Sequence, residues 1–378
     1  MPDNKDILIV AGEASGDLHG GNLARAIRQM RPDVRLSGMG GRRMREAGVD
    51  TVVDNSAVAV VGIWEVLSHF SDIKRAFDDL KGMLYSRRPA AVVLIDYPDF
   101  NLRLAAQARK AGVPVAYYIS PQVWAWRQGR VKKIARLVDK MLVAFPFELK
   151  FYKDAGVDCV FVGHPLLDAV EEMPGKTELC ARLGLDAEKP VLGLLPGSRR
   201  KELHYHMPVM LRSYRMLKEK MPELQAVIPV ADTLTPGDFA RYLEGFSDVR
   251  LVTNDTPGVM AAMDAAVVAS GTATLQTALY GKPMVIIYRL SPLTYQIGRR
   301  LVKVKNIGMV NLVAGEEVVP ELVQDAATPE NISSLISRMF CDKAYYGGLR
   351  EKLASVREKL GGPGASAKAA EEVLKLLG

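Results

Sequence analysis

The sequence predicts an α/β protein with two doubly wound parallel sheets, one in each of two domains. The chain has 378 residues, more than a single hydrophobic core usually serves, so two domains are expected. Short β-branched segments alternate with amphipathic helical segments, which is typical of parallel strands joined by crossover helices. This alternation is interrupted by a stretch containing Pro and Gly near residue 165 and then starts again.

Each half of the chain contains its own set of strand and helix signals. In the first half, strands are expected at residues 6–13 (DILIVAGE), 90–96 (AAVVLID) and 113–120 (VPVAYYIS), and helices at 22–30 (NLARAIRQM) and 102–112 (LRLAAQARKAG). In the second half, strands are expected at residues 190–197 (PVLGLLPG), 224–231 (LQAVIPVA), 248–254 (DVRLVTN), 264–270 (DAAVVAS) and 282–289 (KPMVIIYR). We therefore predict domains at 1–165 and 166–345, and a helical tail at 346–378 that packs back onto the first domain.

Composition excludes several classes of protein. Hydrophobic residues make up 48% and charged residues 25% of the chain, as in ordinary globular proteins. No apolar run approaches the roughly 18 residues that span a bilayer, and the first residues lack a cleavable signal pattern, so a cytoplasmic protein is expected. Three distant cysteines indicate neither a disulfide framework nor a zinc site. The net charge of +7 favours an anionic partner without identifying it.

Ligands of doubly wound sheets bind at the carboxyl ends of the strands, and the first loop there is AGEASGDLHGG. It contains Glu13, Ser15 and Asp17 before a helix, and it matches neither the G-x-G-x-x-G nor the P-loop pattern. One interpretation is a turn in which Ser15 or Asp17 caps the helix. Its density of polar residues favours the other interpretation, a substrate loop.

The second loop, IDYPDFN, places Asp96 and Asp99 on either side of a proline where an apolar strand ends. A carboxylate at such a position can act as a general base. Asp99 has a simpler alternative role as the cap of the following helix. Asp96, nearer the strand, is therefore the preferred base, with Asp99 as the alternative.

The third loop, LLPGSRRKE, joins a strand to a helix through Gly197, Ser198 and Arg199. Backbone N–H groups at a helix start, together with an arginine, suit a diphosphate. The loop is not a nucleophile elbow, which requires G-x-S-x-G. His204 and His206 have no clustered acid or cysteine beside them, so we expect them to face solvent rather than to bind a metal.

The fourth loop, ASGTATLQTAL, opens a helix with Ser270, Gly271 and Thr272. A second helix start at the same edge would further stabilise an anion. Together the third and fourth loops suggest a nucleotide diphosphate, although either alone would also suit a plain connection. No Asp-x-Asp pair that could hold magnesium is present, so no metal is expected.

A basic segment, SPQVWAWRQGRVKKIARLVDK, combines aromatic and cationic residues. Tryptophan suits a membrane interface, and the cations suit anionic headgroups or a phosphate. The residues concerned are Trp124, Trp126, Arg127, Arg130, Lys132, Lys133 and Arg136. If residues 128–140 are helical, an apolar stripe forms that either docks on a bilayer or packs on its own domain; the stripe is Val131, Ile134, Ala135 and Val138.

Six segments, in order and over nearly the whole chain, resemble the signature blocks of the lipid-A-disaccharide synthase family. They are GEASGD, IDYPDFN, SPQVWAWRQGRVKKI, LLPGSRRKE, ASGTATLQTAL and VNLVAGEEVVPEL. The resemblance implies a glycosyltransferase B (GT-B) architecture, with two Rossmann-like domains facing across a cleft and no cofactor or metal. It also implies inverting transfer of 2,3-diacylglucosamine from its UDP carrier to the 6-hydroxyl of 2,3-diacylglucosamine 1-phosphate, at the cytoplasmic face of the inner membrane of a Gram-negative-type bacterium.

The resemblance also implies roles for individual residues. Asp96 would be the base, Glu13 and Ser15 would line the sugar site, and Ser198 and Arg199 would hold the diphosphate. Asn311 and Glu321, from VNLVAGEEVVPEL, would be nucleotide ligands. The first domain would take the acceptor and face the membrane, and the second would bind the nucleotide sugar. Oligomeric state stays open; a homodimer that exchanges its C-terminal helices is one option.

Two other functions are compatible with parts of the sequence. A UDP-sugar 2-epimerase shares the two-domain architecture and the anion loops, but it releases UDP without a lipid acceptor. A non-catalytic binder of lipid or nucleic acid would account for the basic charge. It would not account for two diphosphate-type loops in addition to a paired-aspartate loop, and stacking aromatics of the kind that bind nucleic acid occur in only one segment.

Overall fold

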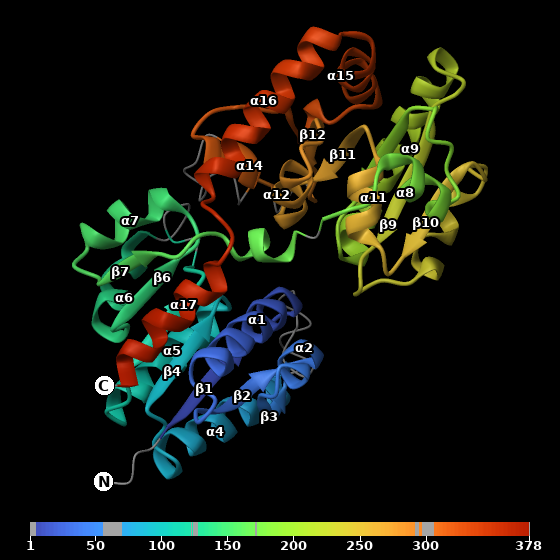
Figure 1. The fold of residues 1–378 in the computed structure, drawn as a ribbon. Helices are drawn as coiled ribbons and strands as arrows, with labels where there is room; N and C mark the ends of the chain where they lie inside the picture. Colours follow the sequence, from blue (N-terminus) through green and yellow to red (C-terminus); the bar gives the residue numbers. More distant parts are fainter. Residues whose placement is uncertain are drawn as a thin grey trace. The chain divides into compact units, whose positions relative to one another are not determined.

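The chain divides into two compact units (Figure 1). The computed structural model describes residues 5–55, 70–121, 123, 128–170, 172–291, 295–296 and 306–377. The first unit comprises Met1–Asp168 and Leu360–Gly378, and the second comprises Ala169–Lys359. The expected return of the tail to the first unit is wrong for residues 346–359, because helix α16 (Lys343–Lys359) packs against α12, α14 and α15 of the second unit.

The first unit is built on a seven-stranded sheet with the order β3-β2-β1-β4-β5-β6-β7. Every neighbouring pair is parallel. The strands are β1 (Asp6–Ala11), β2 (Arg35–Gly40), β3 (Asp50–Asp54), β4 (Ala91–Ile95), β5 (Val115–Tyr118), β6 (Lys140–Val143) and β7 (Cys159–Phe161). The chain runs outward from β1 to β3 and then returns to β4, so the strand order reverses between β1 and β4. Ligands of such sheets bind at this switch point.

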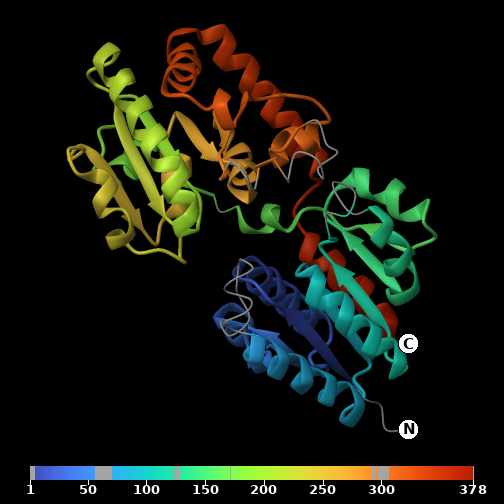
Figure 2. The same cartoon turned by 180° about the vertical axis from the view of Figure 1, so that it is seen from behind.

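Helices cover both faces of the first sheet (Figure 2). They are α1 (Ala14–Met30), α2 (Arg42–Glu46), α4 (Phe70–Ser86), α5 (Pro98–Lys110), α6 (Val131–Leu137), α7 (Pro146–Lys153) and α17 (Ala365–Leu374). One core joins the strands to α1, α2 and α17, and the other joins them to α4, α5, α6 and α7. Because α17 contributes the buried Ala369, Ala370 and Val373, this helix is part of the core formed with α1 and α2.

The second unit has a six-stranded sheet with the order β10-β9-β8-β11-β12-β13, again with parallel pairs only. Its strands are β8 (Val191–Leu195), β9 (Gln225–Val230), β10 (Val249–Thr253), β11 (Ala265–Ala269), β12 (Met284–Tyr288) and β13 (Glu321–Val323). Its helices include α8 (Lys176–Leu183), α9 (Arg200–Lys220), α10 (Ala240–Leu243), α11 (Thr256–Ala262), α12 (Thr272–Leu279), α14 (Met309–Ala314), α15 (Pro329–Cys341) and α16. Here the strand order reverses between β8 and β11.

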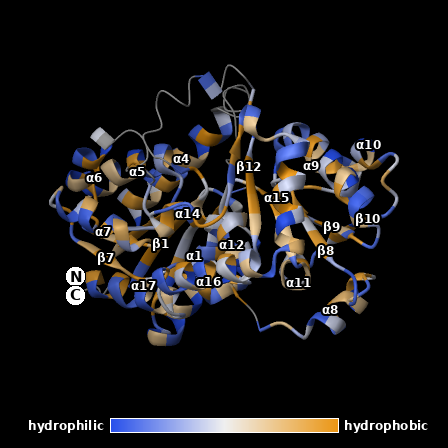
Figure 3. Cartoon of the chain, turned by 90° about the horizontal axis from the view of Figure 1, so that it is seen from above, coloured by the Kyte–Doolittle hydropathy of each residue, from blue (hydrophilic) through white to orange (hydrophobic). Residues whose placement is uncertain are grey.

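Hydropathy follows this layered architecture (Figure 3). The central strands β4, β8 and β11 are buried along their whole length, as expected for parallel strands covered on both faces. The covering helices place apolar residues toward the sheet and polar residues outward. The predicted fold class, two doubly wound α/β units, is therefore confirmed.

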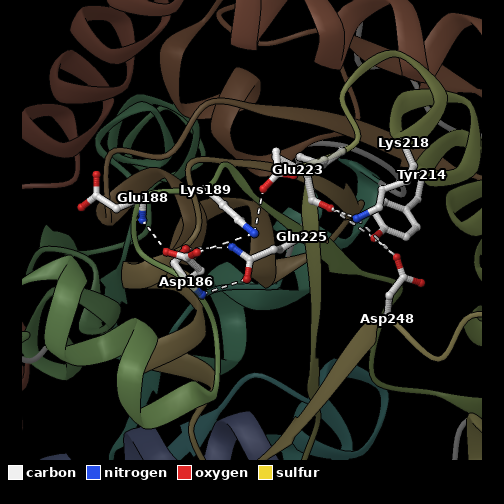
Figure 4. Close-up of polar contacts among 9 residues, drawn as sticks. Asp186, Glu188, Lys189, Tyr214, Lys218, Glu223, Gln225 and Asp248 are labelled. Carbon is white, nitrogen blue, oxygen red and sulfur yellow. Dashed lines mark hydrogen bonds and ion pairs between the residues drawn. The ribbon is translucent and has the colours of Figure 1, made fainter.

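Polar contacts close the amino-terminal edge of the second sheet (Figure 4). Lys189 Nζ lies 2.7 Å from Glu223 Oε2, just before β8 and β9 begin. Tyr214 donates its hydroxyl to Asp248 Oδ2 at 2.5 Å, just before β10. These contacts stabilise the amino-terminal edge of the sheet. The candidate site loops lie at the opposite edge, at the carboxyl ends of the strands.

Candidate functional site

All four loops singled out in the sequence lie at a switch point. The loops after β1 and β4 meet in the first unit, and those after β8 and β11 lie on adjacent strands in the second. In the first unit, Gly12 lies against the ring of Tyr97. A Cβ atom on Gly12 would lie only 2.3 Å from Tyr97 Cδ1, so glycine is needed for the loops after β1 and β4 to approach each other.

The loop after β1 leaves Glu13 and Ser15 accessible to solvent. Glu13 is half-buried and immediately precedes α1, and Ser15 is exposed in the first turn of that helix. Neither Ser15 nor Asp17 caps α1, because its N-cap is Glu13 and no side chain makes the capping bond. The role of Glu13 and Ser15 in the sugar site stays a prediction.

Asp17 has a structural role, and its expected place in the substrate loop is wrong. Its carboxylate is buried and accepts hydrogen bonds from the N–H groups of Gly41 (2.6 Å), Arg43 (2.9 Å) and Met44 (3.1 Å). These are donors at the start of α2 that would otherwise lack partners. Asp17 therefore fixes the loop between β2 and α2 to helix α1.

The backbone holds Asp96 in a strained conformation just after β4. Asp96 and Tyr97 have φ angles of 44° and 47°, in the left-handed region that side chains other than glycine rarely occupy. Asn101 Nδ2 donates to the carbonyls of Ile95 (3.1 Å) and Asp96 (2.7 Å), and the Tyr117 hydroxyl donates to the Asp96 carbonyl (2.5 Å). Such strain persists where surrounding contacts hold the backbone in place, and it is often found at functional sites.

The setting of Asp96 also shifts its protonation. Burial, followed by the nearby carboxylate of Glu13, raises the pKa of Asp96 from 3.8 to about 6. A carboxylate with a raised pKa is a stronger base than an ordinary one, yet it is still ionised at pH 7. The loop after β4 thus provides Asp96 as a candidate general base, and the loop after β1 provides Glu13, which raises its pKa.

Replacing Glu13 with Gln should move the acid limb of the pH profile to lower pH. The substitution removes the second contribution to the raised pKa of Asp96, so Asp96 should titrate a few tenths of a unit to about one unit lower. The pH dependence of kcat/KM for UDP release measures this shift. The exposed Glu46→Gln variant on α2 should leave the limb in place. An unchanged acid limb in Glu13→Gln would show that the Glu13 carboxylate does not act on Asp96.

Asp99 differs from Asp96 in its position, its exposure and its partner. It lies in the first turn of α5, its side chain is 70% exposed, and its Oδ1 is 2.5 Å from Arg130 Nη2. A small pocket of about 200 Å³ surrounds this ion pair between α5 and α6. The geometry favours Asp96 over Asp99 as the base.

The basic segment is only partly described, since Trp124, Trp126 and Arg127 lie outside the described residues. Lys132, Lys133 and Arg136 are exposed on α6. The predicted apolar stripe is not available to a bilayer, because Ile134 and Val138 are buried and Val131 and Ala135 pack against the same core. The stripe-docking interpretation is therefore wrong, and packing within its own domain is the correct one.

The loop after β8 binds an anion of its own chain. Ser198 N–H donates to Glu202 Oε2 at 2.8 Å, and Arg199 Nη1 lies 3.3 Å from Glu202 Oε1. Gly197 has a φ of 113°, and a Cβ atom there would lie 2.1 Å from Glu202 Oε2. An internal carboxylate thus accepts from the groups predicted to hold a diphosphate, and their role as diphosphate ligands stays a prediction.

The loop after β11 begins α12 with a glycine conformation. Gly271 has φ 153° and ψ −163°, a region essentially restricted to glycine. Thr272 is exposed at the helix start, and Ser270 donates its hydroxyl to the Ile307 carbonyl at 3.1 Å. Ser270 therefore connects this loop to the segment before α14.

Asn311 and Glu321 organise that same segment. Glu321 accepts hydrogen bonds from the N–H groups of Ile307 (2.9 Å) and Gly308 (3.0 Å) and from Asn311 Nδ2 (2.7 Å). Asn311 is completely buried, and its amide also bonds the backbone at Val318 and Val319. The expectation that Asn311 contacts the nucleotide is wrong, because it is enclosed by its own chain. The role of Glu321 as a ligand stays a prediction.

His206 does not face solvent as expected. It is buried, its Nδ1 lies 2.8 Å from the Pro196 carbonyl, and its Nε2 accepts from the N–H of Arg289 at 3.2 Å. It joins the ends of β8 and β12. His204 is exposed. Among the described residues, no group of three or more His, Cys, Asp or Glu side chains could hold a metal ion.

Known proteins are similar to this chain in sequence and in fold. The chain matches the family described as Lipid-A-disaccharide synthetase over residues 7–347. It is 53% identical to the lipid-A-disaccharide synthase of Geobacter sulfurreducens, over 98% of this chain and 97% of that protein. The chain belongs to the lipid-A-disaccharide synthase family. It is therefore a glycosyltransferase, and the resemblance noted in the sequence is confirmed.

Solved structures support the fold of this lipid-A-disaccharide synthase family member. The UDP-GlcNAc 2-epimerase from Neisseria meningitidis bound to UDP-GlcNAc matches with a TM-score of 0.67 and 14% identity, over 98% of this chain and 100% of that one. The glycotransferase of kitacinnamycin matches with a TM-score of 0.63 and 17% identity, over 99% of both chains. At these identities the likeness shows the GT-B-type fold alone.

Some residues of the candidate site are not evident from sequence reasoning. Asn101, which fixes the Asp96 backbone, is a buried polar residue within the apolar side of α5, and that contrast is its only signal. Glu202 stands at the third position of α9, a spacing typical of carboxylates that bond back to a helix start. Thr233 donates to the Ser198 carbonyl at 2.5 Å from 35 residues away, and nothing in the sequence indicates this contact.

Proposed function

We propose that the protein transfers 2,3-diacylglucosamine from UDP-2,3-diacylglucosamine to the 6-hydroxyl of 2,3-diacylglucosamine 1-phosphate, with inversion at the anomeric carbon. The products are a β-1,6-linked disaccharide 1-phosphate and UDP. Membership of the lipid-A-disaccharide synthase family supports the choice of substrates. The observation that carries the mechanism is the strained Asp96, whose pKa is raised to about 6 at the switch point of the first sheet.

Asp96 would act as the general base. Its ionised carboxylate takes the proton of the acceptor 6-hydroxyl as that oxygen attacks the anomeric carbon of the donor. The bond from this carbon to the UDP oxygen breaks, and UDP leaves with its electron pair. General base catalysis of this kind contributes about 10²- to 10⁴-fold in rate. Asn101 and Tyr117 would hold the base in place through its backbone carbonyl.

The second unit would stabilise the departing UDP. The N–H of Ser198 and the guanidinium of Arg199 already bind the Glu202 carboxylate. A diphosphate carries more negative charge and more acceptor oxygens than a carboxylate. The start of α12, beside Ser270, Gly271 and Thr272, would add a helix dipole. We propose that these groups stabilise the leaving group without a metal ion.

Product analysis tests this function. The protein is incubated with both lipid substrates in detergent micelles containing EDTA, and the products are identified by mass spectrometry and by the anomeric coupling in NMR. We expect a β-1,6 disaccharide 1-phosphate and one UDP per disaccharide. A donor epimerised at C2 without acceptor, or intact donor after long incubation, would refute the proposal.

We also propose that the enzyme works at the cytoplasmic face of the inner membrane. Within the described part of the chain, no helix is long and apolar enough to cross a bilayer, and the exposed Lys132 and Arg136 on α6 would meet anionic headgroups. Lys132→Glu/Arg136→Glu should sediment less with anionic vesicles at low salt and keep its turnover in neutral micelles. Equal sedimentation of variant and wild type would refute this contact.

A further inference from the structure

A small pocket at the start of α5 collects basic side chains that the transfer step does not use. Its volume is about 200 Å³. It is lined by Pro98, Asp99, Leu102, Arg103, Arg130 and Lys133. Asp99 and Arg103 are one turn apart on α5, and Lys133 lies on α6, which packs against α5. Leu102 is buried, so Asp99, Arg103 and Lys133 stand on two packed helices, and Arg130 ends the 3-10 turn (Gln128–Arg130) just before α6.

The charges in this pocket do not cancel. Arg130 is only 24% exposed and pairs with Asp99, which is 70% exposed. Among the described residues, no carboxylate lies within ion-pair distance of Arg103 or Lys133. Three cations against one carboxylate leave a net charge of about +2. A phosphomonoester carries about −1.5 to −2 at neutral pH and offers three acceptor oxygens, so it matches the pocket in both charge and hydrogen bonding.

The pocket is also close to the base along the chain. Asp99 follows Asp96 by three residues, so their Cα atoms are at most roughly 11 Å apart. The acceptor in the proposed reaction carries its reactive hydroxyl and its phosphate on the same sugar ring. One ring can therefore place its hydroxyl at Asp96 and its phosphate near the start of α5.

We propose that this pocket binds the phosphomonoester of the acceptor, and that Asp99 is its internal counter-ion rather than a second base. The proposal rests on the proposed function. When the acceptor binds, its phosphate replaces the Asp99 carboxylate on Arg130 and also engages Arg103 and Lys133. Asp99 is already largely exposed and turns to solvent. The pocket thereby selects acceptors that carry a phosphate.

The test compares two acceptors, 2,3-diacylglucosamine with and without its 1-phosphate, in neutral detergent micelles. Arg103→Gln/Lys133→Gln should lose about 10- to 100-fold in kcat/KM for the phosphorylated acceptor, as expected when bonds between charged groups are removed. For the acceptor without phosphate it should stay within about twofold of wild type. Lys110→Gln, the loss of one positive charge at the far end of α5, should change neither value. Equal effects on both acceptors would overturn the proposal.

The Asp99→Asn variant tests whether Asp99 acts as a counter-ion or as a base. If Asp99 is the counter-ion, the variant should keep its kcat within about threefold and bind the phosphorylated acceptor as well as wild type or better, because a competitor for Arg130 is gone. A loss of about 100-fold or more in kcat with both acceptors would assign proton transfer to Asp99 and overturn the proposal.

Two further measurements separate this proposal from its alternatives. Sedimentation with anionic vesicles should be equal for wild type and Arg103→Gln/Lys133→Gln. Loss of sedimentation with retained preference for the phosphorylated acceptor would make the pocket a lipid-headgroup site and overturn the proposal. Binding of glucosamine 1-phosphate, measured by calorimetry, needs no catalysis. It should weaken at least about tenfold in the double variant, even if wild type forms no disaccharide and the proposed function fails; unchanged binding would overturn the proposal.

Discussion

Replacing Asp96 with Asn should reduce kcat by about 10²- to 10⁴-fold, the usual contribution of a general base. The amide has nearly the same shape as the carboxylate but cannot take the proton of the acceptor hydroxyl. UDP affinity should be unchanged, because the predicted diphosphate loops belong to the second unit. Steady-state UDP release and calorimetric titration with UDP measure the two quantities. Turnover near the wild-type value would remove Asp96 from the mechanism.

The same variant should be more stable than wild type at high pH. The pKa of Asp96 is raised to about 6 in the folded protein, so the native state favours the protonated form, and stability is lost as the pH rises through about 6. A shift of about two units corresponds to roughly 3 kcal/mol at most. We expect Asp96→Asn to gain roughly 1 to 3 kcal/mol in unfolding free energy at pH 8 and almost nothing at pH 4.

Denaturant unfolding at these two pH values measures the gain. Asp99→Asn is the matched control: its side chain is exposed and paired with Arg130, so it should show no such gain. A lower stability of Asp96→Asn at pH 8 would mean that the ionised carboxylate is stabilised in the fold, and would contradict the strained, desolvated setting described for it.

Replacing Arg199 with Gln should reduce kcat/KM by about 10²- to 10³-fold, the range seen when a donor to a developing negative charge is removed. Charge gathers on the diphosphate as the bond to the sugar breaks, and Arg199 lies next to the N–H that binds the internal carboxylate of Glu202. Arg200 provides a matched control in the next position. Its side chain is 79% exposed and pairs with Asp238 at 2.7 Å.

The comparison of these two arginines is decisive because both variants lose one charge at the same helix start. Arg200→Gln should stay within about threefold of wild type, as expected for an exposed ion pair. If the two variants lose equal activity, general electrostatic attraction rather than a specific contact with the diphosphate would explain the effect.

The general position of the candidate site follows from the sequence because one rule connects order along the chain to position in space. In parallel doubly wound sheets every strand ends at the same edge, so polar residues after strong strands such as β1, β4, β8 and β11 identify the site. The short strands β6, β7 and β13 have three or four residues. They lie outside the strands expected from the sequence, as do β2 and β3.

The roles of individual polar residues could not be predicted in the same way. Asp17 and Asn311 appear in the sequence as plausible ligands, but they bond to backbone groups 24 to 27 residues away for Asp17 and 7 to 8 residues away for Asn311, and Asn311 also bonds the Glu321 side chain. Whether a polar side chain meets a ligand or its own backbone depends on tertiary packing. For the same reason the apolar stripe of α6 is compatible with a membrane or a core until its contacts are known.

The measurement that tests the central claim most directly is the pH dependence of UDP release by the wild-type enzyme, with and without acceptor, in neutral micelles. We predict that release requires the acceptor at every pH, and that kcat/KM falls about tenfold per pH unit below about pH 6, as Asp96 becomes protonated. Release without acceptor would contradict the transferase. An acceptor-dependent rate that stays constant down to about pH 4.5 would contradict a base with a raised pKa.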